Sequence, residues 1–309
     1  MNSQYKIKIF SVYHRPYEIF RSDCIEPIQV GCANNKYDLG FLRDDTGDNI
    51  SQRNGGYCEL TAQYWVWKNY LPLHPELEYI GFCHYRRYMD FWNKNDFCED
   101  SFFNYRYMDT RSFSDTIFEK CVESEILSVL PTGTDIVLPE AYLDERPFSS
   151  ILNLYKFSFG GLGVKECLEV VKSDYPDWLQ DFRDSMNSKS AYHCLTFMMK
   201  RDVFERYAQW IFDFLFKVEN KLKDNPHYKP TGRLEGYLGE LFFNLWIHHE
   251  IRVNKVKVNE CGGVFLDAPA SQLNYNRIRC FFKKIAEFFA RIKAYLWSRS
   301  LLRGCDFLK

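Results

Sequence analysis

The most informative segment of the sequence is Tyr79-Ile80-Gly81-Phe82-Cys83-His84-Tyr85-Arg86-Arg87-Tyr88. Its first five residues form a short apolar run, which predicts a buried strand. A histidine, two arginines and two tyrosines follow directly where that strand ends. In open α/β sheets ligands bind beyond the carboxyl ends of the strands. We therefore expect residues 84–88 to face a ligand, although ion pairs of the two arginines with acidic residues explain them equally well.

Strands and helices alternate on both sides of this stretch, which indicates an α/β fold. Strands are expected at residues 6–13, 27–32 and 135–139. Residues 92–115 are polar and aromatic, and we expect a loop or lid there. Apolar residues recur at helical spacing in four segments, residues 57–70, 114–130, 202–222 and 235–249.

The composition is that of a folded protein. The 309 residues suit one large α/β domain with accessory helices, or a domain of about 250 residues with a tail. Aromatic residues make up 18 % of the chain and can either stack on sugar rings or fill the core. The 11 cysteines are scattered singly without a CxxC pair, and no apolar signal segment opens the sequence, so we expect a reducing cytoplasm.

The charge is unevenly distributed. Residues 276–309 carry nine basic and two acidic residues, a net charge of +7, which leaves −8 for residues 1–275. An acidic body argues against general nucleic-acid binding. Apolar and basic residues occupy opposite helical faces in this tail, so we expect an amphipathic helix on an anionic membrane surface, or alternatively one packed on the domain. No apolar run reaches the roughly 18 residues of a spanning helix.

Two further clusters could carry chemistry. Asp48, Asn49, Ser51 and Asn54 precede a predicted helix and could bind a base or ribose, although Ser51 or Asn54 could instead cap that helix. The segment 233–240 ends in Glu240, which could serve as a general base or simply stabilise a helix start. The chain has no GxGxxG, P-loop, HExxH or Asp-x-Asp motif.

These segments resemble the DUF4422 family. The resemblance is dense over about residues 5–90 and looser through residues 195–200 and 233–246, and it ends by about residue 270. The family is associated with capsule, O-antigen and exopolysaccharide synthesis, and includes an inverting galactofuranosyltransferase that uses UDP-galactofuranose. The resemblance implies a glycosyltransferase domain over residues 1–270, followed by the basic tail over residues 271–309.

The resemblance also implies a fold and a site. We expect a GT-A-like nucleotide-sugar-binding domain with a mixed, mostly parallel sheet, in which the donor diphosphate lies at the end of a central strand. Glu240, or alternatively Glu235, is then the base, and Arg233 and Tyr237 lie on the acceptor side. The residues expected to bind the UDP-sugar are His14, Asp48, Asn49, Ser51, Asn54, His84, Tyr85, Arg86 and Arg87.

The expected reaction needs no cofactor. His84, Arg86 and Arg87 stand where other transferases of this fold hold a metal with an Asp-x-Asp pair, so they are expected to stabilise the diphosphate, although Asp90 could help to hold a metal. The expected acceptor is a lipid-linked oligosaccharide.

Two departures from the family pattern, at Leu195-Thr196 and near Tyr155, leave the acceptor and the donor sugar open. A retaining or pyranose-specific transferase, or a non-catalytic glycan-binding subunit, is the alternative.

Overall fold

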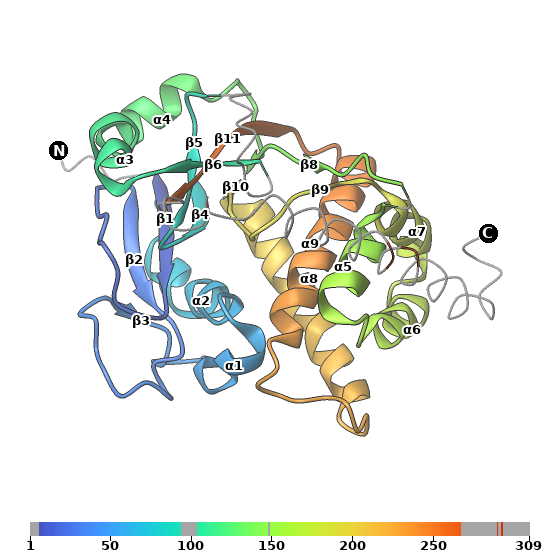
Figure 1. The fold of residues 1–309 in the computed structure, drawn as a ribbon. Coiled ribbons are helices and arrows are strands. Elements are labelled where there is room, and N and C mark those ends of the chain that lie inside the picture. Colours follow the sequence, from blue (N-terminus) through green and yellow to red (C-terminus); the bar gives the residue numbers. More distant parts are fainter. Residues whose placement is uncertain (1–5, 94–103, 148, 267–288, 290–291, 293–309) are drawn as a thin grey trace.

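A nine-stranded sheet forms the centre of the computed structural model, which describes residues 6–93, 104–147, 149–266, 289 and 292. Helices α5 to α9 stack side by side next to the sheet (Figure 1). The strands of the sheet are β1 (Ile7–Tyr13), β2 (Ile25–Gln29), β3 (Leu42–Arg43), β4 (Tyr79–His84), β5 (Arg87–Asp90), β6 (Tyr105–Met108), β7 (Ile136–Pro139), β10 (Phe197–Lys200) and β11 (Val258–Leu266). Strands β8 (Tyr142–Leu143) and β9 (Ser190–Ala191) pair separately.

The helices fall into two groups along the chain. Short helices follow the first strands: α1 (Asn54–Tyr57), α2 (Leu60–Trp65), α3 (Thr110–Thr116) and α4 (Glu123–Val129). The second group comprises α5 (Ile151–Phe159), α6 (Val164–Asp174), α7 (Leu179–Asn187), α8 (Arg201–Leu222) and α9 (Leu234–Val253).

The sheet is mixed, as the sequence predicts. Strands β3, β2, β1 and β4 lie side by side in parallel. Strand β10 runs antiparallel between β4 and β7, while β11 is parallel to β7 and β6 and antiparallel to β5. Gly81 permits the close contact of β4 with both neighbours, because a Cβ there would lie 2.9 Å from both Phe197 O and Ile9 Cγ1.

Both faces of the sheet are buried, which explains the nearly continuous apolar runs of its strands. In β1, Phe10 and Val12 point into the core shared with α2, α8 and α9. Ile7 and Ile9 point to the opposite face, into a smaller core with α3 and α4. This alternation follows from the two-residue period of a strand.

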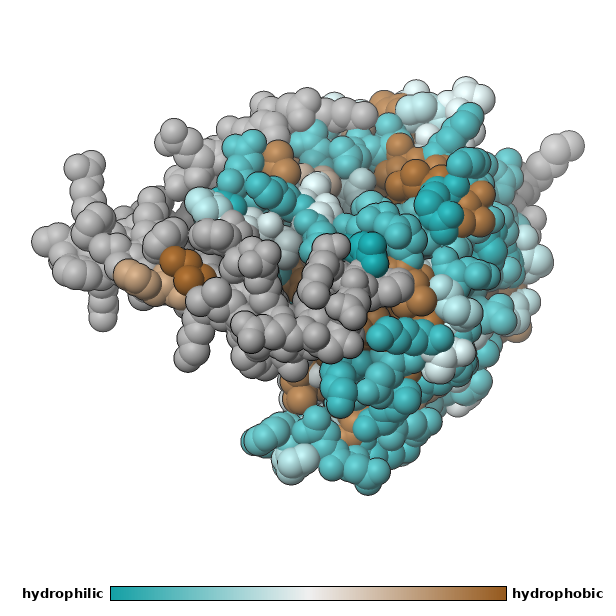
Figure 2. Space-filling model, turned by 90° about the vertical axis from the view of Figure 1, so that its right-hand side faces the viewer, coloured by the Kyte–Doolittle hydropathy of each residue, from teal (hydrophilic) through white to brown (hydrophobic). Residues whose placement is uncertain are grey.

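Helix α9 is apolar on nearly every side because it lies inside the helical layer. Its neighbour α8 has one buried face, as its helical spacing predicts. On the face shown in Figure 2, the described residues are mainly hydrophilic, with hydrophobic residues in small separate groups. No helix in the described ranges combines the length and apolarity needed to cross a membrane.

The structure corrects several local expectations. The helix predicted over residues 114–130 is divided into α3, a 3-10 turn (Phe118–Lys120) and α4. The expected loop over 92–115 contains β6 and most of α3. The predicted tail helix lies outside the described residues except for Phe289 and Ile292, which are helical.

Phe82 tests the main core. Its side chain is 1 % exposed, and its ring centroid lies 5.5 Å from the rings of Phe10, Phe197 and Phe204. We expect Phe82→Ala to lower the free energy of unfolding by about 3–5 kcal/mol, because it leaves a cavity where the sheet meets α8. Leu73→Ala, at a side chain that is 77 % exposed, is the control and should change it by less than about 0.5 kcal/mol. Urea denaturation would measure the free energy of unfolding of both variants. An equal loss of this free energy in the two variants would contradict this account of the core.

Candidate functional site

A cavity of about 800 Å³ lies where the carboxyl ends of β1 and β4 meet the start of α9. Its size suits a small-molecule ligand. Nine residues predicted from the sequence line it: His14, Asn54, His84, Tyr85, Arg86, Arg87, Arg233, Tyr237 and Glu240.

The topology of the sheet brings these residues together. Strands β1 and β4 are parallel, so the segments that follow them emerge at the same edge. Strand β10 is antiparallel to β4, so the residues just before it, His193 and Cys194, reach that edge from the opposite direction. The edge therefore collects side chains from segments far apart in the sequence, as expected for an open α/β sheet.

Arginines make one part of the cavity strongly cationic. Arg15, Arg86, Arg87 and Arg233 all line it. The guanidinium carbons of Arg15 and Arg86 lie 5.5 and 5.1 Å from the centroid of the Tyr85 ring, within cation–π distance. Tyr85 is 5 % exposed, so its ring is held in place by its neighbours and offers both guanidinium groups a fixed surface. Partial desolvation, and then Arg15, Arg233 and Arg86, lower the pKa of His14.

His84 is neutral at physiological pH. Its Nε2 atom is hydrogen-bonded to the carbonyl oxygen of Cys194, which can only accept, so Nε2 carries the proton. Burial, followed by repulsion from Arg87, lowers its pKa to about 3. His84 therefore supplies no positive charge to the cavity, which corrects the expectation that it acts with the arginines as a cation.

Glu240 is fixed at the cavity wall by two hydrogen bonds. Its Oε1 atom accepts one from the main-chain amide of Cys194 (2.9 Å) and one from Nδ1 of His193 (3.2 Å). Burial favours the neutral acid, but these donors outweigh it and lower the pKa of the carboxyl. Glu240 is thus an ionised carboxylate held in one orientation.

Glu59 is a second carboxylate in the cavity, and the sequence did not single it out as a site residue. Its side chain is 16 % exposed, and its Oε1 atom lies 4.0 Å from Nε2 of His84. Burial, and then the charge of Glu240, raise its pKa to about 7. The only sequence signal was its place in a family-like segment, where a position at a helix start suggested stabilisation by the helix dipole.

Three non-glycine residues of the cavity wall have a positive φ angle, which is uncommon for residues with a side chain. These are Cys58 (φ 51°), Cys194 (φ 70°) and Arg233 (φ 60°). Such conformations cost about 1–3 kcal/mol each and cluster at functional sites. Here each one turns the chain at the point where a side chain enters the cavity.

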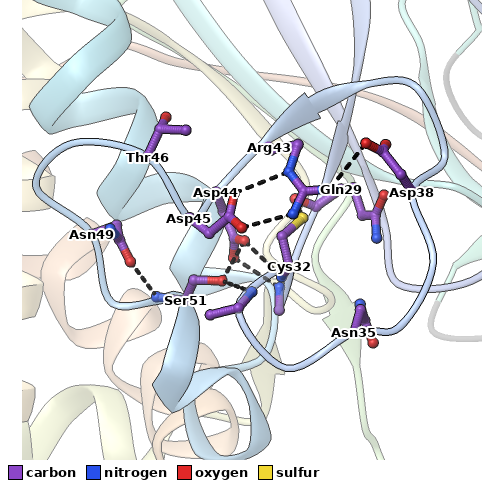
Figure 3. A network of polar contacts seen from close by, with 12 residues as sticks. Gln29, Cys32, Asn35, Asp38, Arg43, Asp44, Asp45, Thr46, Asn49 and Ser51 are labelled. Carbon is purple, nitrogen blue, oxygen red and sulfur yellow. Dashed lines mark hydrogen bonds and ion pairs between the residues drawn. The ribbon is translucent and has the colours of Figure 1, made fainter.

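Asp48, Asn49 and Ser51, which were expected to bind the donor, do not line this cavity. Ser51 is buried and donates a hydrogen bond to Asp44 (2.6 Å), which also accepts from the amides of Gly31 and Cys32 (Figure 3). The Oδ1 atom of Asn49 accepts from the amide of Ser51, and Asp48 accepts from the hydroxyl of Tyr64. These contacts hold together the loop before α1.

Neither Ser51 nor Asn54 caps a helix with its side chain, although the sequence suggested that one of them could. Ser51 is the first residue of a 3-10 turn (Ser51–Arg53) that has no side-chain cap. Asn54 opens α1, and its Nδ2 atom donates to the carbonyl of Cys58 (2.7 Å) and to Thr61 Oγ1 (3.1 Å). Asn54 therefore supports the turn after α1.

Glu235, the alternative base, is not among the residues that line the cavity. It is 1 % exposed, accepts a hydrogen bond from the hydroxyl of Tyr228, and has a pKa raised by burial. Asp90, the possible metal ligand, does not line the cavity either and pairs with Arg106 at 2.8 Å. Within the described ranges, no group of three or more His, Cys, Asp or Glu residues could hold a metal ion.

Comparisons with known proteins agree with this architecture. The solved apo structure of WbbM, titled a bifunctional glycosyltransferase, superposes with a TM-score of 0.73 at 31 % sequence identity. The similarity covers 85 % of this chain and 46 % of WbbM, so this chain spans about half the length of that protein. No curated protein matches the sequence significantly.

A family model described as a domain of unknown function, DUF4422, matches residues 8–251. That range contains all the residues that line the cavity. The resemblance seen in the sequence is thereby confirmed, and the chain belongs to the DUF4422 family.

Proposed function

We propose that this protein is a glycosyltransferase that takes a sugar from a nucleoside diphosphate donor. The main observation behind the proposal is that four arginines and two carboxylates, those of Glu59 and Glu240, line the same cavity. The similarity to WbbM, whose title names glycosyltransferase activity, supports the same class of reaction.

The arginines suit a diphosphate leaving group. When the bond between the sugar and the diphosphate breaks, negative charge builds up on the phosphate oxygens. Guanidinium groups that are already in place stabilise this charge without reorganisation at the moment of reaction. Because His84 is neutral, this task falls to Arg15, Arg86, Arg87 and Arg233.

A carboxylate such as Glu240 suits the acceptor side. Because it is ionised and fixed, it can accept a hydrogen bond from an acceptor hydroxyl and orient it toward the anomeric carbon. Tyr237 lies one turn before it on α9 and lines the same cavity. We propose UDP-galactofuranose as the donor, inversion at the anomeric carbon, and a lipid-linked glycan as the acceptor.

The donor assignment can be tested with the purified protein. We expect transfer from UDP-galactofuranose with inversion, and little transfer from UDP-galactose. Glu240→Gln keeps the shape but removes the charge that orients the acceptor hydroxyl, so transfer should fall by about 10²-fold while donor binding, measured by thermal stabilisation, persists. Retention of configuration, preference for UDP-galactose, or near-normal turnover of the variant would contradict the assignment.

Arginine stabilisation of the diphosphate predicts transfer without a divalent metal. We expect similar rates with excess chelator and with added magnesium or manganese, because the arginines supply the positive charge. Arg87→Ala and Arg86→Ala should each lower the rate at least tenfold in chelator, whereas Arg111→Ala, at an exposed residue of α3, should not. Activity that disappears in chelator and returns with metal would overturn this mechanism.

Residues 271–309 are proposed to hold the enzyme on the inner face of the cell membrane. Attachment would raise the effective concentration of a lipid-linked acceptor. Truncation after Ser271 should leave activity on a soluble acceptor analogue but move the protein from the membrane fraction to the soluble fraction. A truncated protein that stays with membranes at high salt would refute this role.

A further inference from the structure

We infer that Glu59, rather than Glu240, takes the proton from the acceptor hydroxyl. This inference rests on the proposed transferase function and assigns one of its steps. In that step the acceptor oxygen bonds to the anomeric carbon, and the bond from that carbon to the diphosphate oxygen breaks. The bonding electrons leave with the nucleoside diphosphate, and the hydroxyl proton passes to the Glu59 carboxylate.

The backbone places Glu59 inside the cavity. It lies between α1 and α2, directly after Cys58, whose positive φ angle turns the chain. Two glycines of α9 allow this junction to approach the helix closely. A Cβ on Gly236 would lie 3.0 Å from Cys58 Sγ, and one on Gly239 would lie 2.6 Å from Leu60 Cδ1. The glycines that flank Tyr237 and Leu238 in the sequence therefore serve to bring Glu59 and Glu240 into one cavity.

The two carboxylates differ in their hydrogen bonds. Glu240 accepts from the Cys194 amide and from His193, so a proton on its Oε1 atom would displace existing donors. Among the described residues, no other residue donates a hydrogen bond to the Glu59 carboxylate. Its nearest ring nitrogen is Nε2 of His84 at 4.0 Å, which already donates to Cys194. Glu59 can therefore accept a proton without breaking a contact with another residue.

The surroundings of Glu59 favour proton uptake near neutral pH. Burial makes its ionised form costly, and Glu240 adds repulsion, while Arg87 and Arg233 partly offset both effects. The titratable and charged groups around it are Cys58 beside it, His84 of β4, Arg87 of β5, Cys194 before β10, Tyr207 of α8, Arg233 just before α9, and Glu240 of α9.

This pair of carboxylates resembles acid–base pairs in which the environment moves the two pKa values apart. Glu240 has a lowered pKa and remains ionised, whereas Glu59 has a pKa of about 7 and exchanges protons. A general base is most effective when its pKa lies near the working pH. Because the base must be ionised, kcat/KM should rise with pH up to about 7 and then level off.

The pH dependence of transfer tests this assignment. We would measure kcat/KM of the full chain between about pH 5 and pH 9, with UDP-galactofuranose and an octyl galactoside as substrates. The wild-type protein should lose about tenfold per pH unit below its apparent pKa near 7. Glu59→Gln should lower the rate by about 10²–10⁴-fold and abolish this decrease at acid pH, while thermal stability and donor binding persist. Glu59→Asp should have a reduced rate but should still show the decrease in kcat/KM at acid pH.

Glu125→Gln, at an exposed carboxylate of α4, is the matched control and should behave as the wild type. A second readout needs no activity: in NMR spectra of ¹³C-labelled glutamate, one carboxyl should titrate near pH 7 and be absent from Glu59→Gln. The inference is overturned if Glu59→Gln retains the rate or the decrease at acid pH, or if that resonance persists. If the wild type transfers no sugar but shows the resonance, the proposed function fails instead, and the base role fails with it.

Discussion

The main chain of Cys194 is held on both sides of its Cα atom, and the geometry of the cavity depends on these two contacts. Its amide donates to Glu240 of α9, and its carbonyl accepts from His84 at the end of β4. One residue thus joins the sheet to the helical layer. Cys194 and Leu195 both have a positive φ angle where the chain passes from the cavity into β10, a backbone strain that these contacts offset.

These same contacts determine the protonation states around the cavity. The Cys194 carbonyl fixes the proton of His84 on Nε2, and burial beside Arg87 keeps that ring neutral. The Cys194 amide helps to keep Glu240 ionised, and the ionised Glu240 in turn raises the pKa of Glu59. The charges of the site are therefore coupled through hydrogen bonds of the main chain, as well as through direct ion pairs.

Much of the fold and part of the site could be predicted from the sequence. The strand at residues 79–83 and the cluster after it were identified correctly, because a buried strand followed by polar residues is a strong local signal. Ser51 was misinterpreted because its partner Asp44 comes from the loop before it, and a polar residue near a helix start suggests a cap. Glu59 was missed because its raised pKa depends on burial beneath α9, about 180 residues away in sequence.

A neutral His84 changes how the charge of the cavity should be understood. A cationic imidazole between Arg87 and Glu59 would pair with that carboxylate and lower its pKa, so Glu59 could not act near neutral pH. Because burial and the neighbouring Arg87 keep this imidazole neutral, it adds no positive charge beside the arginines that line the cavity. The cavity can therefore stabilise a leaving group with fixed charge while Glu59 still accepts a proton. The uncharged ring of His84 therefore allows one small cavity to contain both the positive charge of the arginines and a carboxylate that is basic near neutral pH.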